Sequence, residues 1–199
     1  MTAEFLLALA GFAFVTSITP GPNNLMLMAS GVNFGLRRTM PHLLGISLGL
    51  ATMIVLVGLG AARAMESIPL LELALRAGCL AFIMWMTWSL LRAEAPDGAP
   101  AKSAPMTFIQ AAGFQWINPK AWAMALTAIA AFAPDRSLPA VGTVAVVFAI
   151  VSLPSIVVWA ALGKRLRAFL TDARRRRIFN AATAALLVVS VLPMILQMG

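Results

Sequence analysis

Long apolar runs dominate this chain, and its charged residues are grouped in short segments between those runs. A helix of roughly 20 apolar residues is long enough to cross the ~30 Å hydrocarbon core of a bilayer. Membrane-spanning strands would instead alternate apolar and polar residues, and the sequence shows no such alternation. The pattern therefore predicts an all-α integral membrane protein. We expect six transmembrane helices, at about residues 5–30, 41–62, 70–91, 106–132, 138–162 and 178–197.

The six expected spans form a single transmembrane domain over residues 1–199. They divide into two halves of three spans, at about residues 1–91 and 106–199, joined by an Ala- and Pro-rich linker at 92–105. Because each half has an odd number of spans, the first spans of the two halves enter the membrane from opposite sides. We therefore expect two inverted three-helix repeats.

Composition and charge placement agree with this class. The chain is 61% hydrophobic and only 11% charged, whereas a soluble domain usually carries about 25% charged residues. The formal net charge of +8 would suit a nucleic-acid binder. However, the basic residues lie between apolar runs, where the positive-inside rule expects them. The expected partner is therefore the lipid bilayer and not nucleic acid.

The same basic residues predict an orientation. The connections after spans 1, 3 and 5 hold most of the Lys and Arg, including the loop pair Arg37–Arg38 and the run Arg174–Arg177. Positive connections stay in the cytoplasm, so both termini are expected outside. We interpret the Arg174–Arg177 run as a topology anchor, and binding of anionic lipid headgroups is its alternative use.

The first span contains a segment that cannot continue a regular helix, formed by Pro20, Gly21, Pro22, Asn23 and Asn24. Proline lacks the N–H that the carbonyl four residues earlier needs, so two carbonyls lose their usual partners. Within lipid such carbonyls are costly, and a break at this depth survives only inside protein or beside a water-filled cavity. The asparagine amides can satisfy the break or bind a ligand.

The fourth span contains a second break, formed by Asn118, Pro119 and Lys120, where Pro119 leaves the carbonyl of Gln115 without a partner. Lys120 lies about thirteen residues inside the span, or roughly 20 Å at 1.5 Å per residue, close to mid-membrane. A lysine there costs about 2.5–3.5 kcal/mol and is functional by default. The acidic residues all fall at or outside the ends of the expected spans, with Glu72 at the start of the third. Lys120 therefore needs backbone carbonyls, water or an anionic ligand.

Each break also has a purely structural explanation, because lysine can extend toward the interface along its own stem and prolines occur in many membrane helices. Two breaks at matching positions of inverted halves favour a midplane substrate site of a secondary transporter. The helix N-termini offer donors for a carboxylate, and the freed carbonyls offer acceptors for an ammonium group. An amino acid carries both groups. The expected substrate-binding residues are Pro20, Gly21, Pro22, Asn23, Asn24, Asn118, Pro119 and Lys120.

At these residues the chain resembles the lysine exporter superfamily of LysE/RhtB-type amino-acid translocators. The resemblance rests on TPGPN at residues 19–23 and NPKA at 118–121, with GLRR at 35–38 and GISLG at 45–49. It covers essentially the whole chain. It implies a six-helix protein of the bacterial inner membrane that exports amino acids or related metabolites, driven by the membrane gradient, often as a homodimer.

Other classes of function have less support. One histidine, one cysteine and no intramembrane carboxylate provide neither a catalytic triad nor a metal site, so we expect no enzyme, metal or cofactor. The same deficit leaves no evident proton carrier, and we interpret His42 as a polar residue at a helix end. Lys120 as the main candidate charge fits a neutral or anionic solute better than a cationic one. A passive channel and a non-transporting membrane scaffold remain as alternatives.

Overall fold

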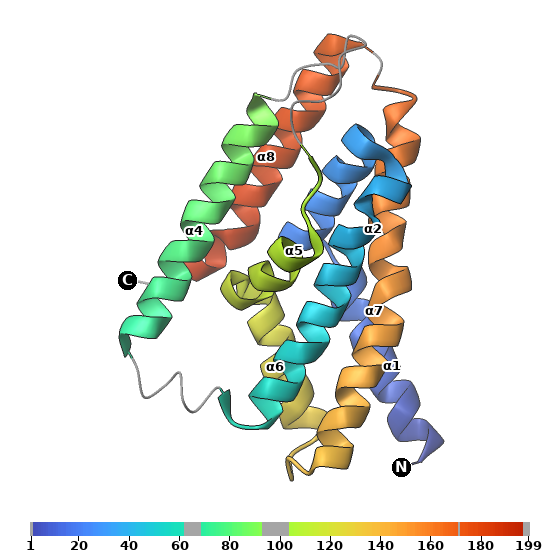
Figure 1. The fold of residues 1–199 in the computed structure, drawn as a ribbon, viewed down its shortest axis with the longest axis vertical. Coiled ribbons are helices and arrows are strands. Elements are labelled where there is room, and N and C mark those ends of the chain that lie inside the picture. Colours follow the sequence, from blue (N-terminus) through green and yellow to red (C-terminus); the bar gives the residue numbers. More distant parts are fainter. Residues whose placement is uncertain (1, 62–68, 93–103, 171, 197–199) are drawn as a thin grey trace.

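The structure is a computed structural model that describes residues 2–61, 69–92, 104–170 and 172–196. All regular secondary structure in these ranges is helical (Figure 1), which confirms the all-α part of the prediction. The elements are α1 (Ala3–Ile18), α2 (Pro22–Gly58), α4 (Pro69–Leu91), α5 (Phe108–Phe114), the 3-10 turn η1 (Gln115–Ile117), α6 (Pro119–Phe132), α7 (Leu138–Arg167) and α8 (Ala173–Leu196). Most of the predicted linker at 92–105 lies outside the described residues.

Two of the described helices, α2 and α7, are long and apolar enough to cross a membrane by length and composition alone. Shorter apolar helical segments lie at Ala3–Ile18, Ala77–Trp88 and Arg177–Ser190. The first and fourth predicted spans each appear as two helices separated by a break. The count of six spans and their inverted repeat therefore stay predictions.

Helix α2 bends sharply at Gly35, whose backbone has φ 75° and ψ 167°. This left-handed φ is readily adopted by glycine and is costly for residues with a Cβ. The bend brings Ser30 Oγ within 2.8 Å of Thr39 Oγ1, although nine residues of straight helix would span about 13.5 Å. The chain thus turns back on itself at Gly35, between a first arm that starts at Pro22 and a second arm that ends at Gly58.

The bend corrects the predicted connection between the first two spans. Arg37 and Arg38 were expected in a loop and Pro41 at a helix start, but all three lie within helical backbone. His42 was expected at a helix end. It lies inside α2, 1% exposed, and neither ring nitrogen has a hydrogen-bond partner among the described residues.

The helices pack closely where glycines face a neighbouring backbone. Helix α7 lies along both arms of α2, and a Cβ on Gly31 or Gly163 would meet the backbone of the facing helix. Gly45 and Gly49 pack against α5 in the same way. These glycines therefore lie at contacts between helices of the chain, where small residues are enriched in membrane proteins.

The largest buried cluster joins α1, the second arm of α2, α6 and α7, and includes Leu9, Met53, Ile129 and Phe148. Helices α4 and α8 pack against each other and lie side by side at the left of Figure 1. A second cluster, with Cys79 and Leu187 among its members, connects this pair to the first arm of α2. The two broken segments lie between these clusters.

Candidate functional site

The first predicted break is present between α1 and α2. Helix α1 ends at Ile18, Thr19 turns to an extended conformation with φ −63° and ψ 143°, and Gly21 is fully extended before Pro22 opens α2. Proline suits that first helical position because its missing N–H would have no partner there in any case. The local sequence therefore stops one helix and starts the next within three residues.

The carbonyls that the two prolines deprive of partners find new donors. Thr19 Oγ1 donates to the carbonyl of Thr16 at 3.0 Å. The indole Nε1 of Trp159, on α7, donates to the carbonyl of Ile18 at 3.0 Å. Buried carbonyls are nearly always paired, and this break satisfies that rule partly through a residue 141 positions away.

Asn24 serves the break itself. It is 3% exposed, and its Nδ2 donates to the carbonyls of Ser17 at 2.8 Å and Thr19 at 2.7 Å. An amide nitrogen has two hydrogens, so both are engaged. This residue, which the sequence offered for substrate binding, therefore holds the broken backbone in place.

The second predicted break lies between η1 and α6. Asn118 is extended, with φ −87° and ψ 111°, and its Oδ1 accepts from Lys120 N at 3.1 Å. The carbonyl of Gln115, expected to lose its partner to Pro119, accepts from Asn118 N at 3.3 Å. Asn118 thus caps α6, whereas the N-terminus of α2 has no side-chain cap.

An amide pair connects the two breaks. Asn23 Nδ2 donates to Gln115 Oε1 at 2.9 Å, and Gln115 Nε2 donates back to Asn23 Oδ1 at 3.3 Å. Gln115 Nε2 also donates to the carbonyl of Ala111 at 2.8 Å, and the side chain is fully buried. The reciprocal pair fixes the start of α2 against η1.

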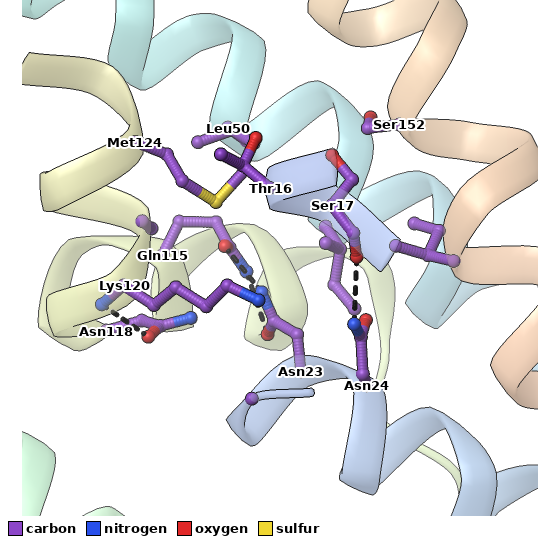
Figure 2. Close-up of a pocket in the computed structure, with 14 residues that line it drawn as sticks. Thr16, Ser17, Asn23, Asn24, Leu50, Gln115, Asn118, Lys120, Met124 and Ser152 are labelled. Atoms are coloured by element: carbon purple, nitrogen blue, oxygen red, sulfur yellow. Dashed lines mark hydrogen bonds between the residues drawn. The ribbon is translucent and has the colours of Figure 1, made fainter. Parts of the chain in front are cut away.

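Lys120, whose side chain extends toward Asn23 in Figure 2, makes the second connection between the breaks. Its Nζ donates to the carbonyl of Thr19 at 2.6 Å, to Thr19 Oγ1 at 3.0 Å and to the carbonyl of Pro20 at 3.4 Å. An ammonium group has three donors, and three neutral oxygens of the other break receive them. Of the three kinds of partner expected for Lys120, namely backbone carbonyls, water or an anionic ligand, the structure shows backbone carbonyls. A Cβ on Gly21 would lie 2.8 Å from Lys120 Cδ, so this approach depends on glycine there.

A cavity of about 30 Å³ lies between the breaks, which is room for about two water molecules. Its polar lining is Thr16, Ser17, Asn23, Asn24, Gln115, Asn118, Lys120 and Ser152, and the rest is Gly21, Ile46, Leu50, Ala121, Met124 and Ile156. These residues come from both broken segments, the second arm of α2 and α7.

Five of the eight expected site residues line this cavity: Gly21, Asn23, Asn24, Asn118 and Lys120. The three prolines do not line it, and they act by ending or starting helices.

Sequence reasoning missed Thr16, Ser17, Gln115 and Ser152 as lining residues. Ser17 and Gln115 adjoin the break motifs, so those motifs could have indicated them. Ser152 lies in α7, far from either motif in the sequence, and no pattern there distinguishes it.

Comparison with known proteins places the chain in a family. The LysE type translocator family matches residues 14–197. A cysteine/O-acetylserine efflux protein of Salmonella typhimurium (strain LT2) is 30% identical over 166 residues, which cover 82% of this chain and 84% of the relative. The Klebsiella pneumoniae protein of that name is 27% identical over 207 residues, covering 99% and 100%. No solved structure matches the chain significantly. The chain therefore belongs to the LysE type translocator family.

Proposed function

We propose that this protein is a secondary transporter that exports a small amino acid or related metabolite across the bacterial inner membrane. Membership of a translocator family supports transport, and the names of the relatives support an amino acid as the solute. A site with one cation and no described carboxylate in its lining suits a solute without net positive charge. The substrate-binding residues are those that join the two breaks, above all Lys120, Asn23 and Gln115.

The observation that carries this proposal is the position of Lys120 between the breaks. Its ammonium group holds only neutral oxygens, those of Thr19 and Pro20. A substrate carboxylate would be a stronger partner, since hydrogen bonds between ionised groups are roughly twice as strong as neutral ones. The uncapped N-terminus of α2 lies beside it and offers backbone N–H groups to the same carboxylate.

In this mechanism the substrate exchanges partners with the protein. Its carboxylate takes Lys120, and its ammonium group takes the carbonyls of Thr19 and Pro20 that Lys120 releases. The exchange removes a direct tie between the α1–α2 break and the start of α6. A ligand shifts a conformational equilibrium only through such differences in contacts. Binding would therefore favour separation of the two broken segments.

The small cavity fits the same mechanism. Pockets that enclose organic ligands usually measure about 300–1,000 Å³, so 30 Å³ corresponds to a closed arrangement. The segments around it have to move apart to admit an amino acid. We propose that the inverted halves, residues 1–91 and 106–199, perform this movement about a midplane site, powered by the membrane gradient.

Uptake of labelled L-serine and L-cysteine into everted inner-membrane vesicles tests the proposal. A carrier should show saturation and dependence on an imposed proton gradient, whereas a channel would not saturate and a scaffold would show no uptake. Lys120→Ala should lower uptake by roughly 100-fold, because it removes charge-assisted bonds to the substrate. Lys164→Ala is the matched control, since Lys164 is exposed near the end of α7, and it should retain uptake. Full uptake by Lys120→Ala at normal expression would contradict the site assignment.

A further inference from the structure

Ser17 has a buried hydroxyl group without a hydrogen-bond partner among the described residues. The side chain is 5% exposed and lines the cavity between the breaks. Buried hydroxyls are almost always paired, because losing water without a replacement partner is costly. An exception in a candidate site therefore needs an explanation.

Helices offer serine an easy partner, which Ser17 does not use. Serine and threonine commonly donate to the carbonyl four residues earlier. Thr16 does so toward Phe12 at 2.7 Å, and Ser155 toward Val151 at 2.9 Å. Ser17 is one residue from Thr16 in the same helix and lines the cavity, yet its hydroxyl has no partner among the described residues.

The cavity has two chemically different ends. Lys120 and Asn23 lie in the lower part of the view in Figure 2, and Thr16, Ser17 and Ser152 lie above them. At the first end the polar groups are bonded to one another across the breaks. The second end has hydroxyl groups and no charge, and apolar side chains such as Leu50 and Met124 complete the lining.

We propose that Ser17 determines specificity by hydrogen bonding to a polar atom on the side chain of a small, neutral amino acid. This inference rests on the proposed function and deepens it. With the substrate carboxylate at Lys120, its side chain extends toward the hydroxyl end. A hydroxyl, thiol or ester oxygen there would pair with Ser17. A charged side chain would find no opposite charge at the hydroxyl end of the lining, and a bulky one would meet Leu50 and Met124.

Competing substrates test this assignment. Everted vesicles would be given L-serine or L-2-aminobutyrate, which carries a methyl group in place of the hydroxyl group of serine. The wild type should prefer serine in kcat/KM, and Ser17→Ala should lower that preference by roughly tenfold while uptake of 2-aminobutyrate stays near wild type. Ser17→Thr keeps the hydroxyl group and should retain the preference. Ser155→Ala is the matched control, because this buried serine lies outside the cavity lining and has its own partner.

A binding measurement separates this inference from the proposed function. Serine should raise the Tm of the purified wild-type protein more than 2-aminobutyrate does, and Ser17→Ala should remove the difference. Loss of serine selectivity in both assays supports the assignment. An equal loss of uptake for serine and 2-aminobutyrate would overturn it, since that pattern belongs to a merely structural serine. An unchanged ratio of the two kcat/KM values would overturn it as well. Wild-type vesicles without uptake, together with a serine-specific rise in Tm that Ser17→Ala removes, would overturn transport while supporting the role of Ser17.

Discussion

The contact of Lys120 with the first break depends on the absence of a side chain at position 21. Gly21 lies opposite Lys120, and a Cβ there would be 2.8 Å from Lys120 Cδ and 3.2 Å from Nζ. Lysine is flexible, so an alanine would displace the ammonium group without disturbing the surrounding helices. The glycine therefore sets how closely Lys120 approaches the carbonyls of Thr19 and Pro20.

At the residue scale, Gly21→Ala should lower amino-acid uptake by roughly tenfold with normal membrane expression, because Lys120 loses part of its hydrogen bonding. Vesicle uptake measures this. Gly11→Ala is the matched control, since nothing lies within 4 Å of a Cβ at Gly11. Equal uptake by the two variants would show that the close approach has no role in transport.

At the scale of elements, α2 and α7 form the most extensive helix contact in the described part of the chain. The first arm of α2 crosses the C-terminal half of α7 at two glycines, where a Cβ on Gly31 would meet the carbonyl of Ala160 and one on Gly163 the carbonyl of Met28. Backbone atoms cannot move aside as a lysine can. The helices themselves would have to separate. Trp159, which donates to the carbonyl of Ile18 at the first break, would move with α7.

Gly163→Ala should therefore destabilise the protein by about 1–3 kcal/mol, the usual effect of overpacking. Thermal unfolding in detergent measures the change, with the loss of monodisperse protein on heating as the readout. Gly142→Ala lies in the same helix with nothing within 4 Å of the added Cβ, and it should be neutral or slightly stabilising. A Tm for Gly163→Ala as high as that for Gly142→Ala would contradict the packing argument.

At the scale of the whole molecule, basic side chains gather where α7 ends and α8 begins. The C-terminal ends of α4 and α7 and the start of α8 lie at the upper end in Figure 1, while the N-terminus and the α6–α7 turn lie at the lower end. Lys164, Arg165 and Arg167 are exposed in the last turn of α7, and Arg174 and Arg175 are exposed at the start of α8. By the positive-inside rule we propose that this upper end faces the cytoplasm.

A periplasm-active reporter fused after Gly199 should then be active, because both termini face outward in this orientation. The same reporter fused after Gly98, within the predicted linker, should be inactive. Reporter activity in intact cells, normalised to the amount of fusion protein, gives the result. An inactive fusion at Gly199 would contradict the six-span arrangement with both termini outside.

The homodimer stays a prediction, which the mass of the purified protein in detergent would test.

The sequence by itself determined the helical class and the places where helices break. Both follow from covalent properties of single residues: apolar side chains favour lipid, and Pro20, Pro22 and Pro119 lack a backbone donor. It also determined that Lys120 needs oxygen partners, because a charge at the depth predicted for it cannot be left alone.

Only the tertiary structure decided which oxygens and donors meet. Lys120 reaches Thr19 across 101 positions, and Trp159 reaches Ile18 across 141. Ser17 and Ser152 line one cavity although no motif joins them. The bend at Gly35 likewise became visible only in three dimensions, since a glycine permits a positive φ without requiring one. Such partners depend on how whole helices pack, and packing is a sum over many distant contacts that no short segment of sequence contains.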